Sequence, residues 1–99
     1  MRIAEVIGCV TLSRCHPSLT GGRFPLAVPL ALDELREAGP GAAEELVVYD
    51  HLGAGVGSRI AVSEGGEAAQ PFYPEMKPID AYNAAILDTI QIKTNPGVA

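Results

Sequence analysis

The sequence has no tryptophan, only two cysteines among 99 residues, and few positive charges. Seven lysines and arginines against twelve aspartates and glutamates give a net charge of −5. This balance disfavours nucleic-acid binding, because such affinity rests on Lys and Arg displacing counterions from phosphates. No apolar run approaches the roughly 20 residues that span a bilayer, and the N-terminus lacks a signal-peptide core. We therefore expect a cytoplasmic protein with neither nucleic-acid nor membrane partners.

The scarcity of cysteine and histidine also argues against a metal site. A structural zinc site needs four ligands, and the adjacent Cys15 and His16 have only Cys9 and His51 to join them, with no paired spacing. Two cysteines make no disulfide framework, and a reducing compartment keeps them as thiols. We expect no metal and no cofactor.

Candidate catalytic groups are few. A nucleophile needs a base and an orienting group, and nothing in the sequence brings Cys15, His16 and Asp50 together. Ser58 follows a glycine turn but is not part of a G-x-S-x-G elbow. The remaining acidic pairs, Asp33-Glu34 and Glu44-Glu45, lie in polar runs that are typical of solvated surface. We expect no catalysis.

The length predicts a single domain with a modest core, because a chain this short buries only about two-thirds of its unfolded surface. Hydrophobic residues nevertheless make up 47% of the chain, and charged residues only 19%. Part of the apolar surface is therefore expected to face a partner, and oligomerisation would add to a small core.

Short strands separated by glycine and proline dominate the pattern. The first should bend at Gly8. Pro25 and Pro29 place the second at a sheet edge or interrupt its hydrogen bonds. Asp80 is a candidate N-cap of a short helix. Strands are predicted at 3–12, 24–32, 45–49, 58–62 and 86–92, an excursion with at most one helical turn at 33–44, irregular chain at 68–78, and the short helix at 79–85.

Five strands and one short helix in so short a chain predict an all-β fold, a small closed five-stranded OB-like barrel, because closure removes exposed strand edges. The barrel domain is expected over residues 1–92, with residues 93–99 as a C-terminal tail.

The stretch Asp50-His51-Leu52-Gly53-Ala54-Gly55-Val56-Gly57 admits two interpretations. Glycines after a strand can cradle a phosphate, but the dinucleotide motif requires a following helix, and here a strand follows. A Walker loop is excluded because Gly-Lys-Ser/Thr is absent. The alternatives that remain are a barrel corner at a subunit contact and, less favoured, a backbone nest for a small anion or metabolite.

We assign structural roles within this turn. Gly53, Gly55 and Gly57 are expected to hold backbone shapes that a Cβ would strain, and Asp50 to fix the turn by accepting nearby backbone N–H groups. Together with Ala54 they are the predicted turn and subunit-contact residues.

Fragments spread along nearly the whole chain resemble one family. They are Met1-Arg2-Ile3-Ala4, Val6-x-Gly8-x-Val10, Pro17-Ser18-Leu19-x-Gly21, Asp50-x-Leu52-Gly53-Ala54-Gly55-Val56-Gly57, Pro78-Ile79-Asp80-Ala81 and Ala85-Ile86-Leu87-Asp88-Thr89-Ile90. Their order and spacing are similar to those of the pentameric vertex proteins of bacterial microcompartment shells, of the carboxysome and ethanolamine-utilisation type.

The resemblance implies an OB-like barrel that assembles as a homopentamer and caps the vertices of a polyhedral shell, beside hexameric and pseudo-hexameric shell proteins. It implies an architectural role without catalysis. A competing hypothesis is a small OB-fold module for an anion, a metabolite or single-stranded nucleic acid, for which five aromatics and an acidic balance are unfavourable.

Overall fold

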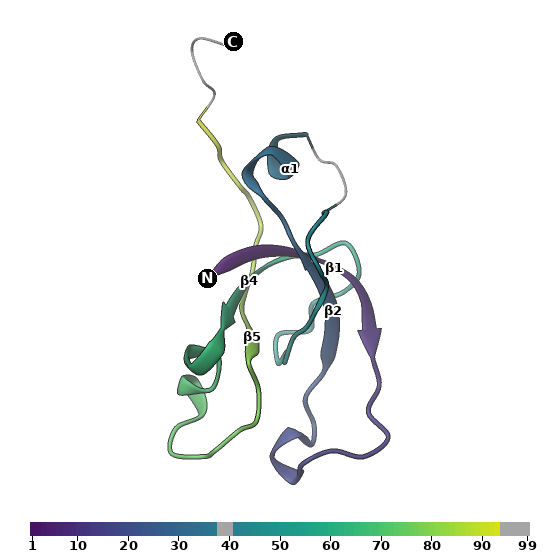
Figure 1. The fold of residues 1–99 in the computed structure, drawn as a ribbon, viewed down its shortest axis with the longest axis vertical. Helices are drawn as coiled ribbons and strands as arrows, with labels where there is room; N and C mark the ends of the chain where they lie inside the picture. The colour runs from purple at the N-terminus through teal and green to yellow at the C-terminus, as the bar shows by residue number, and fades with distance from the viewer. Residues whose placement is uncertain (38–40, 94–99) are drawn as a thin grey trace.

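A computed structural model describes residues 1–37 and 41–93 of the chain. Strands dominate it, and three short 3-10 turns connect them (Figure 1). The strands are β1 (Arg2–Val10), β2 (Phe24–Pro29), β3 (Leu46–Val47), β4 (Arg59–Glu64) and β5 (Ala81–Ile86); the helix is α1 (Leu32–Glu37); the 3-10 turns are η1 (Pro17–Leu19), η2 (Gly65–Ala68) and η3 (Gln70–Phe72). The predicted C-terminal tail lies outside the described residues beyond position 93.

The strands form one antiparallel sheet in the order β3-β2-β1-β4-β5. The central strand β1 arches across the molecule and pairs with both β2 and β4 (Figure 1). Its register with β2 shifts between Val6 and Gly8. The predicted bend at Gly8 is therefore confirmed, and such a bulge increases the local curvature of the strand.

The sheet curls until its two edges meet at Tyr49. This residue forms an isolated parallel bridge with Tyr82 of β5. Its N–H donates to the carbonyl of Ala81, and its carbonyl accepts the N–H of Asn83, both at 2.9 Å. The mainly β, five-stranded architecture with one short helix is as predicted, and among the described residues the barrel closes through this single bridge rather than through a continuous ladder.

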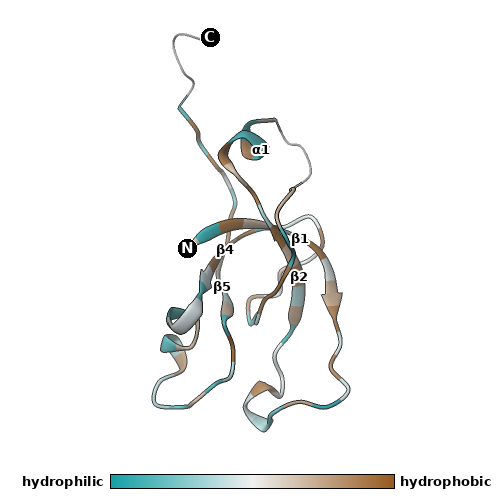
Figure 2. Ribbon diagram, in the orientation of Figure 1, coloured by the Kyte–Doolittle hydropathy of each residue, from teal (hydrophilic) through white to brown (hydrophobic). Residues whose placement is uncertain are grey.

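The barrel interior is filled by small and β-branched side chains, and hydrophobic residues gather where β1 and β2 cross (Figure 2). Such residues suit the tight curvature of a barrel this small. The buried cluster consists of Ala4, Val6, Ala27, Val48, Ala54, Ile60, Val62 and Ala81, with Leu46 packed against it. Ala54 of the glycine turn thus belongs to the core.

Of the two effects predicted for the prolines of β2, an edge position or interrupted hydrogen bonding, the structure shows the second. β2 is not at the edge of the sheet, because it lies between β1 and β3. Its ladder with β3 spans only two residue pairs, Leu26 with Val47 and Ala27 with Leu46. The carbonyl of Pro25 still accepts the N–H of Val48 at 2.9 Å, because proline lacks the donor but keeps the acceptor.

The prediction for the C-terminal third is wrong in its elements. Residues 81–86 form strand β5 rather than part of a helix, and the one described α-helix is α1, in the excursion. Alanines at 81, 84 and 85 favour a helix by propensity, but pairing with β4 from Ile60 to Glu64 overrides it. Asp80 therefore precedes a strand and caps no helix. The closing strand ends at Ile86, and residues 87–93 lack regular secondary structure.

Candidate functional site

The side chain of Asp50 lies at the start of the glycine turn. It is fully buried, and its carboxylate accepts three consecutive backbone N–H groups. The donors are Leu52 at 2.8 Å, Gly53 at 3.1 Å and Ala54 at 2.8 Å. The predicted role of Asp50 in fixing the turn by local hydrogen bonds is what the geometry shows.

A fourth donor reaches Asp50 from β5. The side-chain amide nitrogen of Asn83 donates to Oδ1 of Asp50 at 2.9 Å, and Asn83 is itself fully buried. Its own Oδ1 has no hydrogen-bond partner among the described residues. The backbone of Asp50 also exchanges two hydrogen bonds with Arg23, at 2.8 and 3.0 Å. The turn is therefore joined to β5, on one side of the barrel seam between Tyr49 and Tyr82, and to Arg23, which precedes β2.

These bonds decide the ionisation of Asp50. Burial would raise the pKa of its carboxyl, but the hydrogen bonds from the Leu52 amide, the Asn83 side chain and the amides of Ala54 and Gly53 outweigh burial and lower the pKa below its ordinary value. The group is an anion at neutral pH, and its charge is stabilised by hydrogen-bond donors within the same protomer.

The same geometry removes the basis for a phosphate cradle. The amides that would bind an external anion already point at a carboxylate of the chain itself. A second anion would have to displace Asp50 and would meet its negative charge. The turn is a closed structural unit, because the amides of Leu52, Gly53 and Ala54 are already bonded to Asp50 and are not available to an external anion.

The three predicted glycines have different reasons to be glycine. Gly53 and Gly57 have positive φ angles of 86° and 90°, so an L side chain there would be strained. Gly55 does not have a positive φ, and a Cβ added to it would meet nothing within 4 Å. The prediction of strain at Gly55 is therefore wrong within a single protomer.

The turn carries apolar side chains on its outer side. Leu52 is 51% exposed and Val56 is 75% exposed, and Gly55 lies between them in the sequence. Their backbone is held by the bonds to Asp50 and by further bonds that Gly57 and Ser58 make to Val6 of β1. A rigid loop with exposed apolar side chains is suited to contact another protein surface.

Other predicted candidates are dispersed. Cys9 and Cys15 are exposed thiols. His16 caps η1, accepting the N–H of Ser18 at 3.2 Å, whereas the ring of His51 lies 4.6 Å from that of Tyr49. Within residues 1–37 and 41–93, no three His, Cys, Asp or Glu side chains come close enough to hold a metal ion. In the same ranges no helix has the length and apolarity to cross a membrane.

The acidic pairs behave differently from each other. Glu44 and Glu45 are exposed, as the sequence predicts. Glu34 is not merely solvated: its carboxylate accepts the N–H of Ala31 at 2.8 Å and that of Ala42 at 2.7 Å. It caps the start of α1 and joins both ends of the excursion.

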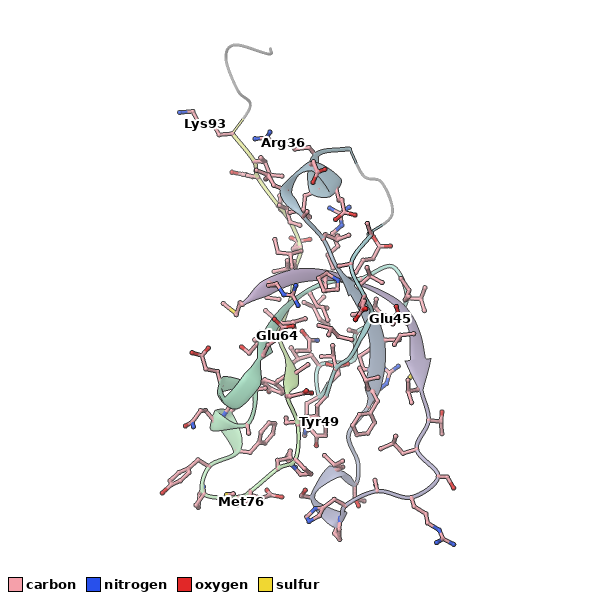
Figure 3. The ribbon with its side chains drawn as sticks, viewed as in Figure 1. Arg36, Glu45, Tyr49, Glu64, Met76 and Lys93 are labelled. Carbon is pink, nitrogen blue, oxygen red and sulfur yellow. The ribbon has the colours of Figure 1, made fainter. Side chains whose placement is uncertain are left out.

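Lys77 was not singled out by any sequence pattern. Its side chain is 5% exposed, and its ammonium lies 5.1 Å from the ring centroid of Tyr49 and 4.9 Å from that of Phe72. It also donates to the carbonyl of Ser18 and lies 3.5 Å from a carboxylate oxygen of Glu75. Lys77 thereby connects η1 with the proline-rich segment and lines an open cavity of about 430 Å³. Met76 of the same segment lies below Tyr49 in the view of Figure 3.

A barrel whose buried carboxylate is engaged by its own backbone, and whose turn 50–57 presents apolar side chains, is typical of a structural protein that works through contacts with other proteins. The model of the family described as "Ethanolamine utilisation protein EutN/carboxysome" matches residues 1–88. The chain belongs to this family.

The relatives and solved structures agree with that assignment. The carboxysome shell vertex protein CcmL of Synechococcus elongatus is 37% identical over 93 residues, covering 94% of this chain and 89% of the relative. The microcompartment shell vertex protein PduN of Salmonella typhimurium is 33% identical, covering 91% and 98%. The GrpN pentameric microcompartment shell protein of Rhodospirillum rubrum superposes with a TM-score of 0.77 at 30% identity, covering 94% and 100%.

The role of the chain is therefore that of a shell vertex protein of a bacterial microcompartment, and it is structural rather than enzymatic. The competing hypothesis of a small binding module receives no support from these relatives. The resemblance first seen in scattered fragments is confirmed across nearly the whole chain.

Proposed function

We propose that five copies of this chain close into a ring that occupies a vertex of the shell, in the cytoplasm, with the turn 50–57 at the contact between neighbouring copies. The domain of residues 1–92 is the repeating unit, and residues 93–99 are its tail. Such a contact is heterologous, because it joins two different patches of the same protein, and its rotation closes after five copies.

The observation that carries this proposal is the outer side of the turn. Leu52 and Val56 are exposed in the protomer although the backbone beneath them is rigid. Gly55 lies between them with neither a positive φ nor a nearby atom to explain it. A neighbouring copy that approaches closely at Gly55 accounts for all three residues, because it covers the apolar side chains and leaves no room for a Cβ.

A five-fold ring also has the geometry that a vertex requires. Six-fold units tile a flat layer, and five-fold units introduce the curvature that closes it. The ring is therefore proposed to abut hexameric and pseudo-hexameric shell proteins at its rim. The high apolar content of the chain supports extensive contact with neighbours.

Mass measurement tests the ring directly. Native mass spectrometry and sedimentation at micromolar protein should give a particle of five times the 10.3 kDa protomer. A protein that stays strictly monomeric under these conditions would contradict the proposal.

Substitution at Gly55 tests the contact. Gly55→Val should leave the protomer folded but raise the concentration at half-assembly by roughly tenfold or more, equivalent to about 1.4 kcal/mol. Gly66→Val is the matched control, because Gly66 is also exposed, also has open space where a Cβ would stand and also lacks a positive φ. Equal assembly of the two variants would remove the turn from the contact.

A further inference from the structure

Residues 87–93, here called the arm, continue from β5 but leave the barrel. Figure 1 shows them running past α1 and away from the sheet. Their sequence, Leu-Asp-Thr-Ile-Gln-Ile-Lys, alternates apolar and polar residues from Thr89 onward, which is the pattern of a strand with one covered face. The arm has the sequence of a strand without its pairing.

The backbone of the arm is nearly unpaired within the protomer. Of the hydrogen bonds between described residues, it takes part in one at each end: the N–H of Leu87 donates to the carbonyl of Arg59 at 2.8 Å, and Arg36 of α1 reaches the carbonyl of Lys93 at 3.5 Å. Extended chain with free N–H and C=O groups is a template for pairing with another strand.

A matching free edge exists elsewhere on the same chain. β3 is the terminal strand of the sheet order, and its pairing partner among the described residues is β2. Val47 is 46% exposed, whereas Leu46 packs against the core. Glu45 and Lys93 lie at separate places on the protomer (Figure 3), so the arm and β3 of one copy are arranged to serve different neighbours.

We propose that the arm of each copy adds as an antiparallel strand to β3 of the next copy in the ring. This inference rests on the proposed ring and names a second part of its contact. Charge fixes the direction: antiparallel addition brings the C-terminal end of the arm, with Lys93, to the acidic pair Glu44-Glu45 that precedes β3.

Burial then fixes the register. Placing Lys93 opposite Glu45 puts Ile92 opposite Leu46 and Gln91 opposite Val47. Within the three facing pairs, residues 45–47 and 91–93, Ile92 and Leu46 are half-buried and the others are exposed. Facing residues of an antiparallel pair project to the same side, so this register directs both half-buried side chains inward and all the exposed ones outward.

A proline scan of the arm tests strand addition. In an added strand only every second N–H points to the partner, so single Pro substitutions at Ile90, Gln91 and Ile92 should alternate in effect. Gln91→Pro should raise the concentration at half-assembly about tenfold, because the N–H of Val48 points to β2 and the outward backbone groups are those of Val47, which faces Gln91. Ile90→Pro and Ile92→Pro should raise it at most about threefold. A uniform response, or none, would overturn the inference.

A charge exchange tests the register independently of folding. Glu45→Lys and Lys93→Glu should each weaken assembly about two- to fivefold at low salt, and the double exchange should restore it to within about twofold of the original. Additive losses in the double variant would overturn the register. A flat proline scan together with a persistent five-copy mass would refute strand addition by the arm but not the ring. A monomeric parent chain would refute the ring itself.

Discussion

Replacing Asp50 by asparagine tests the central claim that this carboxylate holds the turn. Asparagine has almost the same shape but offers one acceptor oxygen where aspartate offers two. In the native turn each oxygen accepts two donors: Oδ1 accepts from Leu52 and Asn83, and Oδ2 accepts from Gly53 and Ala54. The variant therefore sets an NH₂ group against two N–H donors.

Leaving a buried donor without an acceptor costs about 1–3 kcal/mol. Two such donors predict a loss of about 3 kcal/mol in the free energy of unfolding, a large part of the roughly 5–15 kcal/mol typical of a domain. Urea-induced unfolding followed by circular dichroism at pH 7 measures it. Parent and variant must be compared at equal protomer concentration, because assembly also stabilises the folded chain.

The pH dependence adds a second signature. The pKa of Asp50 is lowered in the folded state, so its contribution to stability is present above the unfolded pKa of about 3.9 and is lost as pH falls through the folded pKa. The difference between the parent and Asp50→Asn should therefore be full at pH 7 and shrink as pH falls below about 4.

The exposed Asp80 provides the matched control, and Asp80→Asn should stay within about 0.5 kcal/mol of the parent. A loss below about 1 kcal/mol for Asp50→Asn at pH 7, or a difference that does not depend on pH, would refute the reasoning.

Further substitutions probe other elements by the same unfolding assay. Gly57→Ala should cost about 1–2 kcal/mol because its φ is +90°, whereas Gly55→Ala should leave the isolated protomer unchanged; equal losses would contradict the assignment. Glu34→Ala should lose about 1 kcal/mol by freeing two backbone N–H groups, and Glu34→Gln, which keeps an acceptor, should lose less. Lys77→Met keeps the aliphatic stem but removes the charge above two rings, with an expected cost of about 1–2 kcal/mol; a neutral result would show that packing alone holds the segment.

Local chemistry was sufficient to predict part of the fold. Gly8 in a β-branched run marks the bulge of β1, and Asp50 before three glycines indicates a side chain that bonds its own turn. Both inferences depend on residues a few positions apart. The strand content followed from patterns of the same short range, whereas the family followed from the order and spacing of fragments along nearly the whole chain.

Features that depend on distant partners were missed. The alanines of β5 favour helix, and only pairing with β4 makes the segment a strand. Lys77 gains its role from Tyr49 and Ser18, which lie far from it in the sequence. Gly55 is expected, together with Gly53 and Gly57, to hold a backbone shape that a Cβ would strain, but its φ places no such demand.

The single bridge at Tyr49 has a consequence for how the barrel opens. The amide hydrogens of Tyr49 and Asn83 are the two that close the seam, whereas β1 is paired on both sides. The seam can therefore part in a local fluctuation while the sheet around β1 stays intact. The exchange rates of these two amide hydrogens with solvent deuterium measure how long the closed barrel persists, and ring formation should slow them.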